Sequence, residues 1–321
     1  MKILLACLLL FTAFFYSVSH GREGGGSLTA PPRKIIFKRP LKKGDFFSCF
    51  ARLNRSFEYT LALPGSKNIE RKEVLALSLA GILRIQEVNQ KGLPEKISLY
   101  ISSITGSRNG KEIRSRDWKG QELLGDFRSR EFGPQFRAPG LKRKLTVDEK
   151  LLFQALFPGG EAGSLADFTT PFLTLREKEK FPLQLTSLLA SLAARKITDK
   201  KDALSGEGEY LGKTKFRGIE CHKLRIHFAA KNVPGYDLRY QAELLLPEDP
   251  DLGPPLQIYR NAKEFLKRTI SSSNQFAAGG RLSQLVSEET SITLMPESAP
   301  QLPGREDRGK SEGFHQLLRP R

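Results

Sequence analysis

The fold of this chain is decided by residues 47–63, which read Phe47-Ser48-Cys49-Phe50-Ala51-Arg52-Leu53-Asn54-Arg55-Ser56-Phe57-Glu58-Tyr59-Thr60-Leu61-Ala62-Leu63. Most odd positions of this stretch are apolar and most even positions are polar, with Phe50 as the main exception. Side chains of a β-strand point alternately to its two faces, so a period of two indicates a strand with one buried face. We therefore predict one long strand whose odd positions point toward the core.

The same alternation recurs on both sides of the centre of the chain. Pro64-Gly65-Ser66 interrupts the first strand, and the apolar positions that follow predict an antiparallel partner. Strands are predicted over residues 75–85, 97–101, 210–228, 236–246, 256–270 and 287–295. Within 210–228, Leu224 is out of phase with Cys221, which predicts a β-bulge near His222 and Lys223.

Two helices are predicted between these groups of strands. Thr146-Val147-Asp148-Glu149 is a capping box, in which Thr146 caps the helix and Glu149 reaches back, and Pro158-Gly159-Gly160 ends this helix. Residues 185–194 predict a second helix. Strands that precede and follow a helical centre, without regular alternation, indicate an α+β fold that is mainly antiparallel β. We expect a long, curved, half-barrel-like sheet with a central helical cover.

Three features of the chain carry a resemblance to known proteins. They are Pro40-Leu41-Lys42-Lys43-Gly44-Asp45-Phe46 before the first strand, the leucine-rich helix near 147–157, and Tyr210-Leu211-Gly212 followed by Gly218-Ile219-Glu220-Cys221. With the expected sheet, these features resemble the half-barrel of bacterial envelope carriers for lipoproteins and lipids, and a loose group of secreted bacterial proteins of unknown function. The resemblance covers residues 40–270, rests on no specific motif and implies no catalytic residue.

The ends of the chain predict export. Residues 1–19 have a positive start, an apolar run and small residues at the cleavage position, as in a secretory signal peptide. An uncleaved membrane anchor is the alternative, and Cys7 has the setting of a lipoprotein box with its apolar region misplaced. We predict a flexible linker over 20–34, a single β-rich domain over 35–296, a disordered tail over 297–321, and a periplasmic or extracellular location.

The net charge of +17 favours anionic partners. Because the chain is exported, we expect a lipid, an anionic polymer or an envelope protein as partner, and no nucleic acid. The densest basic segment is 108–144. Its candidate anion-binding residues are Arg108, Lys111, Arg114, Arg116, Arg128, Arg130, Lys142, Arg143 and Lys144. The alternative is a solvated basic surface whose aromatic residues point inward.

Cys49 and Cys221 are the two cysteines beyond the leader, and both lie in predicted strands. An even pair in an exported chain predicts a disulfide. The alternative is two buried free thiols, because free cysteine behaves as a small hydrophobic residue.

The sequence contains no recognisable catalytic motif. His222 and His227 are five apart on a predicted strand, so they should point to opposite faces and not share a metal ion. No phosphate loop, nucleophile elbow or zinc motif is present, and we expect no cofactor. The sequence therefore predicts a non-enzymatic exported protein that binds an apolar or amphipathic ligand, or a partner protein, on the concave face of the sheet. The alternative is a peripheral binder of anionic cell-surface lipid or polysaccharide.

Overall fold

Strand β2 (Phe46–Ala62) confirms the alternation predicted for the opening stretch. Phe47, Cys49, Ala51 and Leu53 are each at most 3% exposed, whereas Arg52, which lies between two of them, is exposed. From Phe47 to Leu53 the odd positions of β2 thus point to the core, as the period of two predicts, whereas every position from Arg55 to Ala62 is intermediate in exposure.

The computed structural model describes residues 31–297, except 38, 91, 114–115, 129–134, 157–168, 231 and 270–279. The predicted leader, most of the linker and the tail beyond Glu297 lie outside the described residues. Strand β1 (Arg33–Ile36) includes the last two residues of the predicted linker, 33 and 34. Arg33 and Lys34 pair with β8 (Phe172–Leu175), which accounts for the difference.

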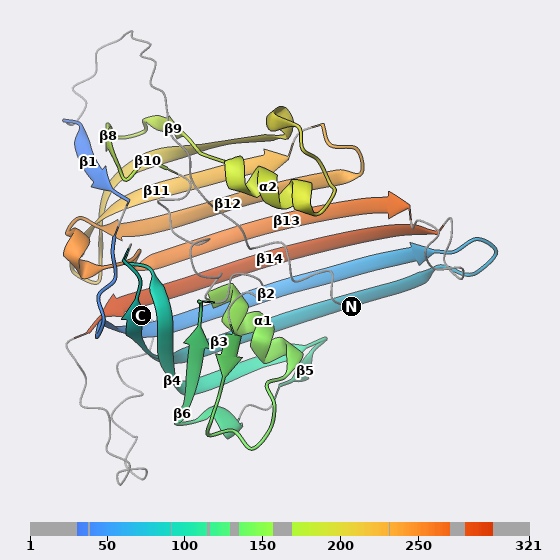
Figure 1. Cartoon of the computed structure of the whole chain (residues 1–321), viewed down its shortest axis with the longest axis horizontal. Helices are drawn as coiled ribbons and strands as arrows, with labels where there is room; N and C mark the ends of the chain where they lie inside the picture. Colours follow the sequence, from blue (N-terminus) through green and yellow to red (C-terminus); the bar gives the residue numbers. More distant parts are fainter. Residues whose placement is uncertain are drawn as a thin grey trace.

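The described chain forms one large antiparallel sheet that is not closed, and a small sheet made of β1 and β8. In the large sheet the strand order is β7-β6-β4-β3-β2-β14-β13-β12-β11-β10-β9, and β5 pairs with β4 (Figure 1). The remaining strands are β3 (Ile69–Val88), β4 (Pro94–Arg108), β5 (Lys111–Glu112), β6 (Gln121–Asp126), β7 (Gln135–Arg137), β9 (Lys180–Pro182), β10 (Leu204–Phe216), β11 (Ile219–Ala230), β12 (Tyr236–Pro247), β13 (Gln257–Thr269) and β14 (Arg281–Pro296). Each half of the sheet is a run of neighbouring strands, and pairing of β2 with β14 joins the halves along both strands.

The prediction of a single bulged strand over 210–228 is wrong. A tight turn at Arg217-Gly218 separates β10 from β11, and both turn residues have positive φ, of 49° and 84°. This is the conformation of a two-residue hairpin turn. The register shift lies in β10, between Tyr210 and Gly212, and not near His222. Cys221 and Leu224 are out of phase because both faces of β11 are buried there.

We call the sheet face that carries Ala51 the inner face. Cross-strand pairs extend it from Ala51 to Ile292, Ile258, Leu244 and Leu224, across five neighbouring strands. Directly opposite residues of a ladder share a face, so one inner face serves both halves of the sheet. One buried cluster lies on β2, β3, β4 and β6, and another lies on β10, β11 and β12.

The two helices cover separate parts of the inner face. Helix α1 (Val147–Leu156) places Leu152 and Phe153 in the first cluster, and helix α2 (Thr186–Ala194) places Leu192 in a cluster with Tyr236 of β12. Figure 1 shows both helices on the same side of the sheet, with β13, β14 and β2 passing between them. The mainly antiparallel sheet is confirmed, whereas a single central helical cover is not.

The capping box of α1 is confirmed. The Glu149 backbone N–H donates to Thr146 Oγ1 at 3.2 Å, and the Thr146 N–H donates to Glu149 Oε2 at 2.7 Å. Among the described residues, three short 3₁₀ turns, at Arg116–Trp118, Lys201–Ala203 and Pro250–Leu252, lie in connections between strands.

Candidate functional site

Between the two helices the inner face carries apolar side chains that nothing in the described part of the chain buries. We call this set the inner strip, and it consists of Phe57, Tyr59, Leu61, Ile69, Leu282 and Val286. All six are at least partly exposed, and none belongs to the four buried clusters. Within the described residues, β2, β3 and β14 continue beyond the elements that cover the core, and the strip lies on this extension.

The register confirms that the strip is continuous. Phe57 pairs with Val286, and Leu61 pairs with both Leu282 and Ile69, so their side chains share the inner face. The rings of Phe57 and Tyr59 lie 5.7 Å apart between centroids, tilted by 45°. Ile69, at the hairpin end of the strip, is 48% exposed. Contiguous exposed apolar surface of this kind marks binding sites more often than scattered apolar residues do.

Charged groups border the strip beside α1. Glu73, opposite Phe57 on β3, pairs with Arg71 and lies 3.7 Å from Arg108. Arg108 also lies 2.7 Å from Asp148 of α1. Burial raises the pKa of Asp148, Arg108 opposes this effect, and Glu73 adds to it. This border is therefore a chain of alternating charges that joins α1 to the sheet.

A second charged pair borders the strip beside α2. Arg195 Nη1 lies 2.7 Å from Glu264 Oε1 of β13, and the Tyr236 hydroxyl donates to the same oxygen at 3.0 Å. Both partners of the ion pair are about one-fifth exposed. Apolar surface flanked by paired charges suits a ligand with a long apolar part.

Three of the six arginines predicted to bind anions are paired with acids of this chain. Arg108 pairs with Asp148, and Arg128 Nη2 lies 2.6 Å from Asp126 Oδ2. The side-chain hydrogen bond from Arg128 is the main cause that lowers the pKa of Asp126 to about 2. Such engaged guanidinium groups add little to an anion-binding surface.

Arg143 is held inside a network around Glu149, the third residue of α1. Its Nη2 and Nη1 groups donate to Glu149 Oε1 and Oε2 at 2.6 and 2.9 Å, and Trp118 Nε1–H donates to Oε1 at 2.6 Å. Burial alone raises the pKa of Glu149, but the hydrogen bonds from Arg143, Trp118 and Thr146 lower it to about 2. Arg143 thus joins the first turn of α1 to the 3₁₀ turn that carries Asp117 and Trp118. Sequence reasoning found the Thr146 cap and missed Trp118 and Arg143, which no spacing rule connects to Glu149.

The remaining members of the predicted basic surface are dispersed or lie outside the described residues. Lys111, Lys142 and Lys144 are exposed. Arg114 and Arg130 lie outside the described residues, as does the side chain of Arg116.

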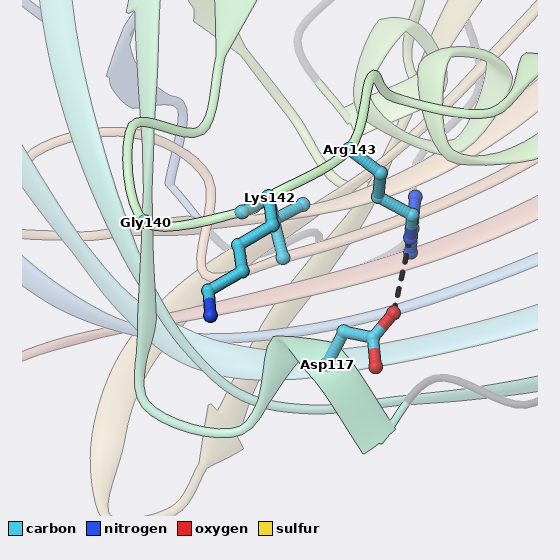
Figure 2. Close-up of a pocket in the computed structure, with 5 residues that line it drawn as sticks. Asp117, Gly140, Lys142 and Arg143 are labelled. Carbon is cyan, nitrogen blue, oxygen red and sulfur yellow. Dashed lines mark hydrogen bonds and ion pairs between the residues drawn. The ribbon is translucent and has the colours of Figure 1, made fainter.

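An open depression of about 340 Å³ lies beside this basic segment, lined by Asp117, Gly140, Leu141, Lys142 and Arg143. Figure 2 shows Arg143 turned toward Asp117, with which it makes a 3.0 Å ion pair, while Lys142 extends away from the pair. One free ammonium group beside a neutralised arginine makes a weak anion site.

The disulfide predicted between Cys49 and Cys221 is not formed, and both residues are buried free thiols. Cys49 lies on the inner face of β2, whereas Cys221 lies on the opposite face of β11. Four strand spacings, about 19 Å on a flat sheet, separate these strands, and a disulfide needs Cα atoms within about 7 Å. The alternative of two buried thiols agrees with the structure.

The two strand histidines point to opposite faces, as predicted. His222 is 3% exposed on the inner face, where its Nδ1 lies 3.1 Å from the Tyr210 hydroxyl, while the side chain of His227 is 49% exposed. Among the described residues, no group of three or more His, Cys, Asp or Glu side chains is arranged to hold a metal ion. No helix in the described part of the chain has the length and apolar character needed to cross a membrane.

No protein-family model matches the chain, and a search of curated proteins finds no match. Among solved structures, a LolA-superfamily protein from Nitrosomonas europaea is similar at 10% identity, over 83% of this chain and 91% of that one, with a TM-score of 0.14. An outer-membrane channel from Pseudomonas putida F1 is similar at 8% identity, over 80% and 98% of the two chains, with a TM-score of 0.21. The loose resemblance predicted from the sequence is confirmed at this weak level. Scores this low leave function to be argued from the chain's own residues.

Proposed function

We propose that this protein is an exported, non-catalytic protein that binds an apolar or amphipathic ligand on its inner strip. The observation that carries the proposal is the change along one face of β2. Leu53 is 1% exposed in the core, whereas Phe57, Tyr59 and Leu61 on the same face are partly exposed beside Ile69. A ligand on the strip removes this apolar surface from water.

Burial of the inner strip offsets part of the free-energy cost of association. Covering roughly 300 Å² of apolar side chain stabilises a complex by about 7 kcal/mol at 25 cal/mol per Å², before the entropy cost of association. Apolar sites with a few polar groups at their borders are typical of small-molecule binding. The charged pairs at Glu73 and Glu264 supply such borders.

The proposed location rests on the predicted leader over residues 1–19, which directs the chain to the periplasm or the extracellular space. A partner protein that buries an apolar segment is the other occupant that suits the strip. Binding of an anionic polymer through the basic segment is less well supported, because Arg108, Arg128 and Arg143 are paired with acids of the same chain.

A neutral fluorescent probe tests the proposal without involving charge. N-phenyl-1-naphthylamine should bind the purified protein saturably, with increased fluorescence. Leu61→Asp places a charge on the strip and should abolish the increase. Thr60→Asp places the same charge on the opposite face of β2 and should leave it unchanged. Absence of saturable binding by the wild-type protein contradicts the proposal.

A further inference from the structure

Arg55 is the charged residue that separates the buried part of β2 from the inner strip. It occupies an odd position between Leu53 and Phe57, and therefore lies on the inner face. Its neighbours across the ladder are Leu75 of β3, which is 5% exposed, and Glu288 of β14. The Arg55 residue is partly buried, at the end of the strip nearest to the core.

The guanidinium group of Arg55 has no ion-pair or hydrogen-bond partner among the residues that the structure describes. Glu288, the acid directly opposite, accepts a hydrogen bond from the Thr290 hydroxyl at 3.4 Å, and the two residues form no ion pair. Arg71, Arg108 and Arg195, at the borders of the strip, are all paired with acids. Partial burial of an unpaired charge is unfavourable. A ligand with an anionic group should therefore bind more tightly when that group forms an ion pair with Arg55.

We propose that the ligand of the inner strip is a long-chain carboxylate whose head group pairs with Arg55 and whose chain runs along Phe57, Tyr59 and Leu61 toward Ile69. This inference rests on the proposed function and specifies its ligand. From Arg55 to Leu61 the strand advances by about 20 Å, which suits an extended long-chain acyl group.

A singly charged head group suits the surroundings of Arg55 better than a doubly charged one. One guanidinium group pairs with one carboxylate through two parallel hydrogen bonds. Glu288 lies on the next strand and repels a doubly charged head group more strongly than a singly charged one. The carboxylate is therefore preferred over a phosphate monoester carrying the same chain.

Displacement of bound N-phenyl-1-naphthylamine measures this preference. Hexadecanoic acid should displace the probe from the wild-type protein at a concentration about tenfold lower than hexadecanol, since a charge-assisted hydrogen bond contributes on this scale. In Arg55→Gln the acid and the alcohol should become equivalent, and Arg55→Lys should restore part of the preference. Arg52→Gln removes the same charge from the opposite, exposed face and should leave the preference intact.

The outcomes separate this inference from the proposed function. Equal displacement by acid and alcohol in the wild-type protein overturns the assignment of Arg55, while binding of the neutral probe still supports the strip as a site. An acid preference that persists in Arg55→Gln, with probe affinity unchanged, also overturns it. Tighter binding of hexadecyl phosphate than of hexadecanoic acid overturns the choice of carboxylate. Failure of the neutral probe to bind wild-type protein removes the proposed function itself.

Discussion

Leu53 and Leu61 lie on the same face of strand β2, yet Leu53 is 1% exposed and Leu61 is partly exposed. Leu53 packs in the cluster that includes Leu152 and Phe153 of α1. Leu61 lies near the hairpin end, beyond α1, where its cross-strand neighbours are Ile69 and Leu282. The first residue belongs to the core, and we assign the second to a binding surface.

Aspartate substitutions should separate these two roles. Leu53→Asp buries a carboxylate without a partner and should lower the free energy of unfolding by roughly 3–5 kcal/mol. Leu61→Asp leaves its carboxylate in contact with water and should cost about 1 kcal/mol or less. Urea unfolding of the full chain measures both, with Thr60→Asp as the control. Equal destabilisation by Leu53→Asp and Leu61→Asp shows that the strip is part of the core.

Glu149 should make stability depend on pH in the acid range. Its folded pKa of about 2 lies below the ordinary value of 4.5. A lowered carboxyl pKa stabilises the fold above pH 4.5, and this contribution is lost as the pH falls from 4.5 toward 2. The difference of about 2.5 pKa units corresponds to roughly 3 kcal/mol.

The comparison of Glu149→Gln with wild-type protein tests this contribution. The variant should be less stable by roughly 3 kcal/mol at pH 7, and the difference should shrink as the pH approaches 2. Exposed Glu122→Gln serves as the control and should change stability by less than about 0.5 kcal/mol. A pH-independent difference between Glu149→Gln and wild type shows that the Arg143–Glu149 contact does not carry the predicted charge effect.

Both strand thiols should be unreactive in the folded protein. Burial raises the pKa of Cys49 to about 12 and also raises that of Cys221. Because the thiolate is the reactive form, iodoacetamide at neutral pH should modify neither residue in the native state. In denaturant without reductant both should be alkylated, as peptide mapping will show. A peptide pair linked through Cys49 and Cys221 contradicts the structure.

The sequence predicts the local structure of this protein well where a feature depends only on residues that are close together in the chain. The alternation from Phe47 to Leu53, the turn at Pro64-Gly65-Ser66 and the capping box at Thr146 each depend on neighbouring residues, and each is confirmed. The prediction of one bulged strand over 210–228 fails, because a turn at Arg217-Gly218 divides it into two strands. Residues on both faces of β11 are buried, and in the sequence this looks like a shift in the alternation of apolar positions.

The long-range arrangement could not be predicted from such signals. Pairing of β2 with β14 joins residues more than 200 positions apart, and no local pattern specifies that register. The same limit explains the disulfide, because an even cysteine count says nothing about strand order or face. It also explains the basic segment, whose arginines look available in sequence but meet Asp126, Asp148 and Glu149 in space.

Photo-crosslinking tests the central claim most directly. A long-chain fatty acid with a photoreactive diazirine near its chain end is bound to the purified protein, irradiated and mapped by peptide mass spectrometry. We expect crosslinks to concentrate in the strand segments that carry Leu61, Ile69 and Leu282, and to disappear in Leu61→Asp but not in Thr60→Asp. Crosslinks confined to the opposite face of the sheet, or equal labelling of both variants, contradict the inner strip as the binding site.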